Sequence, residues 1–270
     1  MLSPHHLNTD QIKQVKEKAI KLLPELRKEL GDKSEGVSDK NLLKFLHWKP
    51  DVKRATERFK SHVQWRKKNR FVFDDDPPLL ASKDATLKRL LEGEVIVAPD
   101  GCLDKENNTV LFGRFRNNDM SDGRSPQDVV RMMIYVIDKV LENENAQING
   151  VTVFHDMKDL SRKNLHPAIP KMILGAVIGN FPIRIQGVYI LNAPGFFQAL
   201  FKPLSLLMPS KLRQRIHFVK SLSDIPINKE NLLPEHNGML AFDVKEWVES
   251  RLQRETSDMI SSLSSIPVPS

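Results

Sequence analysis

The first part of the chain carries apolar residues at helical spacing, separated by Lys, Arg, Glu and Gln. Residues 8–30 form the clearest case, with apolar side chains three or four positions apart and Thr9 as the expected N-cap. Two further helices are predicted to begin at Ser38 and at Pro50, each with one apolar and one charged face. The pattern predicts a small helical module over residues 1–72.

The pattern then changes to short β-branched or aromatic runs that alternate with helical segments. The runs that predict strands are 109–115, 150–156, 185–192 and, as an edge strand, 216–219. Helices are expected over residues 126–141, 167–178 and 244–254. Strands that alternate with helices favour βαβ crossovers and parallel pairing. The predicted fold class is therefore α/β, with the helical module followed by a mixed, largely parallel sheet.

Composition separates the remaining segments. Residues 73–94 are predicted as a linker, because the acidic, proline-containing DDDPP follows the helical module. The sheet domain is expected over residues 95–255. Residues 256–270 end in SSLSSIPVPS and are predicted as a flexible tail.

One stretch, APGFFQALFKPLSLLMPSKLRQR at 193–215, begins with apolar residues and ends in a cluster of positive charge. Phe197, Leu200, Phe201 and Leu204 are spaced so that they share one face of a helix. Composition alone favours a buried core helix here. That interpretation gives no reason for the basic turn that follows.

Positive charge is distributed unevenly along the chain, whose formal net charge is +7. Residues 1–70 hold 18 Lys and Arg against 9 Asp and Glu, so the rest of the chain is close to neutral. Within that remainder, residues 160–223 contain nine basic residues and no acidic one. Such local asymmetry predicts an anionic partner. Nucleic acid, phospholipid headgroups and phosphorylated ligands all fit this charge pattern.

Cysteine content and hydropathy indicate the compartment. Cys102 is the single cysteine and lies in a Pro-Asp-Gly loop, so no internal disulfide can form and we expect a cytoplasmic protein. The longest apolar stretches are well short of the ~20 residues that a membrane span needs. The N-terminal residues contain no apolar signal core.

The sequence contains little that is typical of an enzyme. It has no G-x-S-x-G elbow, no G-x-x-x-x-G-K-[ST] loop and no G-x-G-x-x-G fingerprint after a strand. His155 and Asp156 close a predicted strand, where a catalytic pair could sit, but no Ser or Cys is placed to complete a triad. The histidines lack the spacing of metal ligands. We expect no enzyme activity, and therefore no catalytic residue, no metal and no cofactor.

Three stretches together resemble one family. They are VSDKNLLKFLHWKPDVKRATERFKSHVQWR at 37–66, NGVTVFHDMKDLS at 149–161, and the segment 180–218 with LLPEHNG after it. This order of motifs is similar to that of CRAL-TRIO proteins, from the D-x-x-L-L-K/R-F-L run to the F-P-x-[KR] pattern. The chain resembles the animal branch that contains α-tocopherol transfer protein and the retinaldehyde-binding proteins.

The resemblance implies a fold and a function. The sheet and its helices are expected to enclose a lipid behind a mobile apolar gate helix, which carries Phe197, Leu200, Phe201 and Leu204. The expected function is intracellular transfer of a tocopherol-, retinoid- or isoprenoid-like ligand, with exchange at phosphoinositide-containing endosomal or plasma membranes. The alternative is a phosphoinositide-binding adaptor with a structural lipid. A bound hydrophobic lipid is expected as the ligand, without a cofactor, and a monomer is expected.

The resemblance also implies where the lipid lies. The residues expected to line its pocket are Val151, Val153, His155, Ile173, Val177, Phe181, Val188 and Ile190. His155 shares the strand face of Val151 and Val153. Two interpretations of it stay open: a structural, hydrogen-bonded histidine, or a polar group inside the pocket that meets a ligand hydroxyl or carbonyl.

Basic residues at matching motif positions imply a phosphoinositide site. Arg184 stands in F-P-x-[KR], and Lys211 and Arg215 stand in K-L-R-Q-R. Arg66, in the W-R that ends the helical module, matches another basic position, although it could equally tie the two parts of the chain together. Guanidinium groups suit bidentate binding of phosphate. Nucleic-acid binding is not expected, since no recognition motif accompanies the basic faces.

Overall fold

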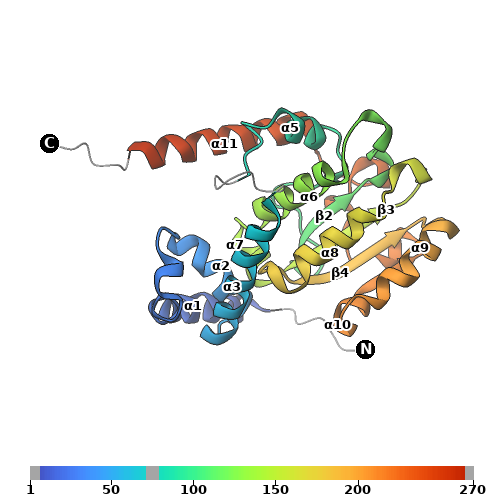
Figure 1. Ribbon diagram of the computed structural model, residues 1–270. Helices are drawn as coiled ribbons and strands as arrows, with labels where there is room; N and C mark the ends of the chain where they lie inside the picture. Colours follow the sequence, from blue (N-terminus) through green and yellow to red (C-terminus); the bar gives the residue numbers. More distant parts are fainter. Residues whose placement is uncertain (1–6, 71–78, 265–270) are drawn as a thin grey trace.

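The computed structural model describes residues 7–70 and 79–264, with side chains up to residue 257, as a helical N-terminal part packed against an α/β part (Figure 1). This confirms the predicted fold class. The acidic segment 74–78 and residues 265–270 of the predicted tail lie outside the described residues.

The N-terminal part consists of α1 (Thr9–Leu30), α2 (Asp39–Trp48) and α3 (Val52–Lys68). Their apolar faces meet in one cluster that includes Ala19, Leu26 and Phe45. Thr9 was the expected N-cap of α1, but the structure shows that Asn8 is the N-cap. The Asn8 side chain accepts from the Gln11 amide at 2.9 Å, and Gln11 accepts from the Asn8 amide in return. This reciprocal capping satisfies two free amides and outweighs a cap by Thr9.

The second part follows in this order: α5 (Ala85–Glu92), β1 (Ile96–Val97), β2 (Thr109–Gly113), α6 (Pro126–Val140), α7 (Glu144–Ile148), β3 (Val151–Asp156), α8 (Ala168–Asn180), β4 (Ile185–Leu191), α9 (Gly195–Leu206), α10 (Ser210–Arg213), β5 (Ile216–Val219) and α11 (Val244–Ser264). Helix α5 lies inside the segment predicted as a linker. Helix α11 continues past the predicted end at residue 254 and into the segment predicted as a tail.

The sheet has the strand order β1-β2-β3-β4-β5. Strand β1 runs antiparallel to β2, and every later neighbour pair is parallel. Strand β5 lies at the edge, as predicted. The register places His155 of β3 between Gly113 of β2 and Ile190 of β4. It also places Val188 of β4 opposite Ile216 of β5. These pairs position the site described below.

The two faces of the sheet are covered differently. Helices α6 and α8 pack on one face over β1 to β3, in a core that includes Leu111 and Val151. On the other face, Ile225 and Leu233 come from an irregular segment and cover Phe154. Over β4 and β5, the face that α6 and α8 cover elsewhere is covered, among the described helices, only by α9. This helix has no buried residue between Gly195 and Leu206. The sheet is therefore least covered at its β4–β5 end.

Buried polar contacts hold the helical part against the α/β part. His47 Nδ1 lies 2.6 Å from Gln147 Oε1, and both side chains are buried. The ring of Phe181, which follows α8, lies edge-on to His62 at 4.7 Å and to Trp65 at 5.4 Å. Because buried polar groups without a partner are costly, the His47–Gln147 contact ties α2 to α7 in one defined arrangement.

Candidate functional site

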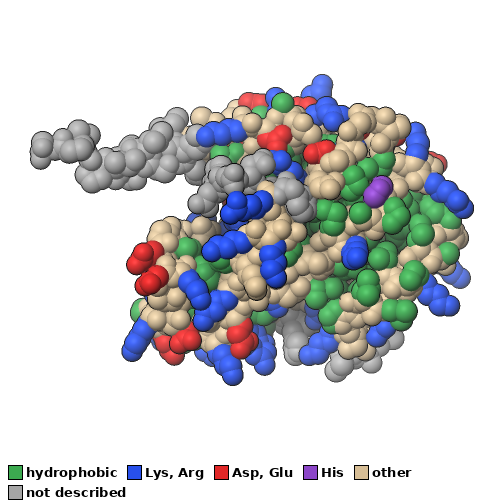
Figure 2. Space-filling view, viewed as in Figure 1, with side chains coloured by type: hydrophobic (Ala, Val, Ile, Leu, Met, Phe, Trp, Pro, Cys, Tyr) green, Lys and Arg blue, Asp and Glu red, His purple; other side chains and the backbone are tan. Residues whose placement is uncertain are grey.

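An apolar face of the sheet is open to solvent between α8 and α9. Side chains alternate along a strand, so Val153 and His155 of β3 share this face with Val188 and Ile190 of β4 and with Ile216 of β5. All of these except Ile190 are only half-buried. Figure 2 shows apolar side chains gathered here, with Lys and Arg side chains around them. Exposed apolar patches of this kind mark binding surfaces more often than packing faults.

Helices α8 and α9 form the two borders of this face (Figure 1). Ile173 and Val177 of α8 are half-buried and pack against the core beside the sheet. At the other border, Phe197 packs with the cluster that contains Val188 and Ile190. The apolar face is thus bordered by α8 and α9, and it is defined by Val153, His155, Val188, Ile190, Ile216 and Phe218.

Helix α9 also contacts the edge strand β5 through aromatic rings. The Phe201 ring lies 5.2 Å from that of Phe218 on β5, and the Phe197 ring lies 6.5 Å from it. The outer side chains are exposed, Leu200 by 48%, Leu206 by 73% and Leu207 by 63%. These exposed side chains do not fit the alternative of a buried core helix, which composition alone favoured, and the role of α9 as a gate stays a prediction. We call the three exposed leucines the leucine ridge.

Two of the residues expected to line a pocket are fully buried. Val151 is 1% exposed and Phe181 is 0% exposed, and both belong to the main core. Phe181 contacts α3, as described above. The other six residues lie on the apolar face or along α8 beside it. Their role in ligand binding stays a prediction.

His155 lies flat against Phe115, with ring centroids 4.7 Å apart and 20° between the planes. Burial lowers the pKa of His155 to about 4. The neighbouring Asp156 points to the opposite face, where it accepts from the Asn192 side chain at 2.8 Å. Alternation along β3 therefore separates the pair that sequence placed side by side, and the two cannot act on one substrate.

At the carboxyl ends of β2 and β3, the LPEHNG segment is fastened by ion pairs. Glu235 accepts from Arg114 and from Arg116, each at 2.9 Å. Arg114 is buried and also pairs with Glu94. His236 lies 3.4 Å from Glu235, and burial lowers its pKa. Because Arg114, Arg116 and Glu235 are all paired, the LPEHNG segment has a structural role in holding the ends of β2 and β3.

Basic residues meet at the opposite edge of the sheet, where β4 and β5 begin. Arg184 donates through Nε to the Trp48 carbonyl at 3.0 Å, and Arg215 donates to the Ile185 carbonyl. Burial lowers the pKa of Arg184, and the charge of Arg215 lowers it further. Lys211 on α10 is exposed. Among the described residues, neither arginine has a carboxylate within 4.0 Å, so both cations can accept an anion.

Arg66, the fourth predicted phosphate contact, faces another part of the molecule. Burial raises the pKa of Asp138 on α6, and the positive charge of Arg66 acts to lower it. Lys44 of α2 acts on Asp138 in the same way. This arrangement fits the alternative in which Arg66 ties the helical part to the α/β part. Its part in phosphate binding stays a prediction.

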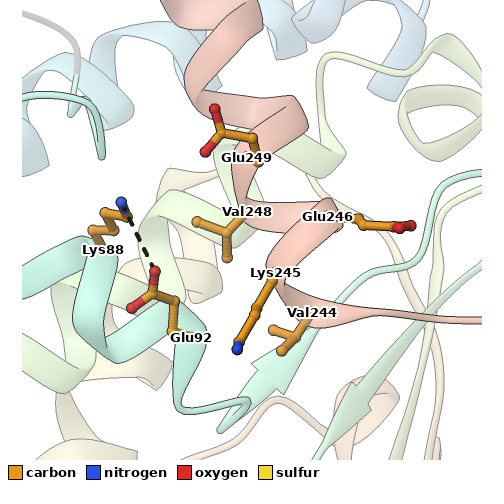
Figure 3. Close-up of a pocket in the computed structure, with 7 residues that line it drawn as sticks. All are labelled: Lys88, Glu92, Val244, Lys245, Glu246, Val248 and Glu249. Carbon is orange, nitrogen blue, oxygen red and sulfur yellow. Dashed lines mark ion pairs between the residues drawn. The ribbon is translucent and has the colours of Figure 1, made fainter.

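Two other hollows lie away from the apolar face. The first, of about 490 Å³, lies between α5 and the start of α11 (Figure 3). It is lined by Lys88, Glu92, Val244, Lys245, Glu246, Val248 and Glu249. Lys88 and Glu92 lie 3.9 Å apart, and charges of both signs line the groove, which marks it as a seam between packed helices. The second hollow lies beside Trp48, where the Arg58 guanidinium stacks at 4.2 Å over the indole ring.

Some residues of the site were missed from sequence. Phe218 lies on the apolar face because β5 is in register with β4, and alternation within IHFV was the available signal. Phe115 was assigned to a strand but lies in a short 3-10 helix after β2, where it stacks on His155. Nothing in the sequence indicated that Trp48 contributes its carbonyl to Arg184.

Comparisons with known proteins agree with this geometry. Residues 94–238 match the CRAL/TRIO domain family, which is more than half of the 270 residues. The chain is 26% identical to human alpha-tocopherol transfer protein-like over 231 residues, which cover 82% of this chain and 65% of that protein. It is 27% identical to human Clavesin-2 over 139 residues, or 48% of this chain and 42% of that one.

A third relative is an enzyme. The chain is 27% identical to human Tyrosine-protein phosphatase non-receptor type 9 over 203 residues, which cover 73% of this chain and only 32% of the phosphatase. The chain thus spans less than two thirds of each of these relatives. Among solved structures, the crystal structure of Sfh5 matches with a TM-score of 0.51 at 14% identity, over 78% of this chain and 81% of that one. This likeness shows the fold.

Proposed function

The chain belongs to the CRAL/TRIO domain family, and from that membership we propose that it is a lipid-transfer protein that carries one small hydrophobic molecule on the apolar face. The relative named alpha-tocopherol transfer protein-like supports a tocopherol-like ligand, and a retinoid or another isoprenoid is proposed beside it from the resemblance alone. The phosphatase name is not carried over, because the match covers only 32% of that protein.

The observation that carries this proposal is the half-buried apolar face between α8 and α9. Val153, Val188 and Ile216 keep part of their surface in contact with water, at a cost of ~25 cal/mol for each Å² of apolar area. A bound lipid removes water from these side chains and from its own apolar surface. A folded chain gains most from a ligand where its own side chains leave such a face uncovered.

Direct contact with a membrane follows from the size of the ligand. A lipid with ~20 apolar carbons costs of the order of 16 kcal/mol to release into water, at ~0.8 kcal/mol per CH₂. A carrier must therefore lift it from the bilayer without a free aqueous step. The leucine ridge provides apolar side chains that can enter the bilayer at the edge of the apolar face. In the described part of the chain, no helix has the length and apolar character needed to span a membrane.

Basic residues near the leucine ridge favour a membrane with a negatively charged surface. Lys202 on α9 and Lys211 and Arg213 on α10 are exposed, and Arg184 and Arg215 lie beside them at the start of β4 and β5. Basic residues at an anionic leaflet contribute about 1 kcal/mol each. Such contacts hold the protein reversibly, as transfer between membranes requires. Phosphoinositide headgroups fit the paired guanidiniums of Arg184 and Arg215.

The proposal is tested by transfer between two populations of vesicles. Donor vesicles carry a fluorescent tocopherol analogue, and acceptor vesicles contain or lack phosphatidylinositol bisphosphate. We expect the protein to speed up transfer at catalytic amounts, and to do so more with phosphoinositide in the acceptor. Binding to the vesicles without any transfer would support the phosphoinositide-binding adaptor with a structural lipid instead.

Lys211→Ala tests the contribution of the basic edge. Removal of one exposed cation is expected to weaken binding to phosphoinositide vesicles about fivefold, because such a charge contributes about 1 kcal/mol. High salt should remove most of the difference. Lys245→Ala, an exposed lysine on α11, is the matched control and should bind as the wild type does. Equal losses in both variants would show that only net charge matters.

A further inference from the structure

We propose that His155 is the hydrogen-bonding partner of a neutral hydroxyl or carbonyl group on the bound lipid. This inference rests on the proposed function, and it narrows the ligand to lipids with one uncharged polar head. It gives His155 the role of a specificity-determining residue on the apolar face.

The ring of His155 is held in a cradle built by two neighbours. The Nδ1 edge lies against Gly113, where a Cβ on the glycine would come within 1.7 Å of Nδ1. Phe115 stacks on the flat side of the ring. Any larger residue at position 113 would displace the imidazole, so the glycine leaves the space that this orientation needs.

This orientation places Nδ1 against Gly113 and directs the opposite edge of the ring away from it. Nδ1 is buried against the backbone of Gly113, which is the hydrogen-bonding group that acts on the imidazole and opposes the lowering of its pKa. The atoms nearest Gly113 are Nδ1 and Cε1, so the other edge of the ring carries Nε2 and Cδ2. His155 as a whole is only half-buried, and the edge with Nε2 and Cδ2 is the one that faces away from Gly113. Since Gly113 occupies the Nδ1 side, Nε2 is the ring nitrogen that is left for a ligand.

The surroundings of that edge are apolar. Among the strand residues of this face, namely Val153, His155, Val188, Ile190, Ile216 and Phe218, His155 is the one polar side chain. A ligand that covers the face removes water from His155 as well. The imidazole then needs a polar atom from the ligand, since a polar group without a partner is costly to bury.

Protonation decides which polar group fits. Burial lowers the pKa of His155 to about 4, so the imidazole is neutral at cytosolic pH. A neutral imidazole offers one N–H donor and one acceptor nitrogen. It can therefore bond an alcohol, a phenol or a carbonyl oxygen, whereas a carboxylate would find no cation there. The ligand class is a lipid with an uncharged oxygen at one end.

The test compares two lipids that differ by one hydroxyl. Phosphatidylcholine vesicles hold phytol and phytane at equal mole fraction, and the protein is recovered and its bound lipids are quantified by mass spectrometry. His155→Phe keeps an aromatic ring and removes both nitrogens. We expect the bound phytol-to-phytane ratio to fall about tenfold in H155F, because a hydroxyl would be buried without a partner. Phytane uptake should stay the same.

His155→Gln is the matched control, since its amide nitrogen reaches close to the position of Nε2. It should keep most of the wild-type ratio, while His155→Asn, which mimics the enclosed Nδ1, should behave like H155F. A ratio that is unchanged in H155F would overturn the assignment and leave the carrier function standing. Uptake of neither lipid by the wild type would instead overturn the proposed function and this inference with it.

A second measurement does not depend on the stability of a variant. In protein labelled with ¹⁵N-histidine, phytol should shift the Nε2 resonance of His155, and phytane should leave the ring nitrogens without a new hydrogen-bond partner. Equal shifts with both lipids would contradict a hydrogen bond to the hydroxyl.

Discussion

Replacement of Leu206 and Leu207 by glutamate is expected to weaken membrane binding about a hundredfold while the protein stays folded. The two leucines are 73% and 63% exposed, so their loss removes little packing from the molecule. Insertion of two such side chains contributes about 2 kcal/mol, and two carboxylates at an anionic leaflet oppose binding by about 1 kcal/mol or more. A total of about 3 kcal/mol corresponds to roughly a hundredfold change.

Vesicle flotation measures the binding, and the vesicle assay measures transfer. Ile20→Glu is the matched control, because Ile20 is 61% exposed but lies on α1 in the helical part. I20E should bind and transfer as the wild type does. If L206E/L207E still binds anionic vesicles at full strength, the leucine ridge is not the membrane contact.

Glu255→Ala is expected to destabilise the fold by about 4 kcal/mol, because a buried charge holds several donors in place. Glu255 is 2% exposed and accepts from the Tyr135 hydroxyl at 2.6 Å and from the Ser82 amide at 2.9 Å. Lys139 lies 3.7 Å away. Alanine would leave all of these groups without their acceptor. Burial raises the pKa of Tyr135, and the hydrogen bond to Glu255 raises it further.

Urea unfolding followed by circular dichroism gives the free energy of unfolding. Glu255→Gln keeps one carbonyl acceptor and should lose less than half as much. Glu249→Ala, an exposed residue on the same helix, should change stability by less than about 0.5 kcal/mol. A loss below about 1 kcal/mol in E255A would show that α11 is not anchored through this carboxylate to α6 and to the turn at Ser82 before α5.

Sequence was sufficient for the elements that carry a strong periodic signal. The β-branched runs gave the four parallel strands to within two residues, and α6 began at the predicted Pro126. Strand β1 has two residues and α7 has five, so neither is long enough to show a period. Helix α5 was missed because the proline-rich, acidic residues before it led us to assign the whole segment to a linker.

The candidate site could be predicted only in part, because its chemistry depends on contacts between distant segments. Alternation placed Val153 and His155 on one face correctly. The leucines of α9 do not predict whether the helix is buried, because the same side chains occur in a buried core and on an exposed surface. Arg66 faces Asp138, which is far away in sequence, and a single sequence does not reveal such pairs.

The central claim is that the apolar face between α8 and α9 holds one lipid molecule. Native mass spectrometry of the wild-type protein, after incubation with vesicles of a cellular lipid extract, tests it most directly. We predict a one-to-one complex whose added mass is that of a single neutral lipid with an oxygen at one end. The bare mass of the chain alone, under conditions in which the protein is folded, would contradict it.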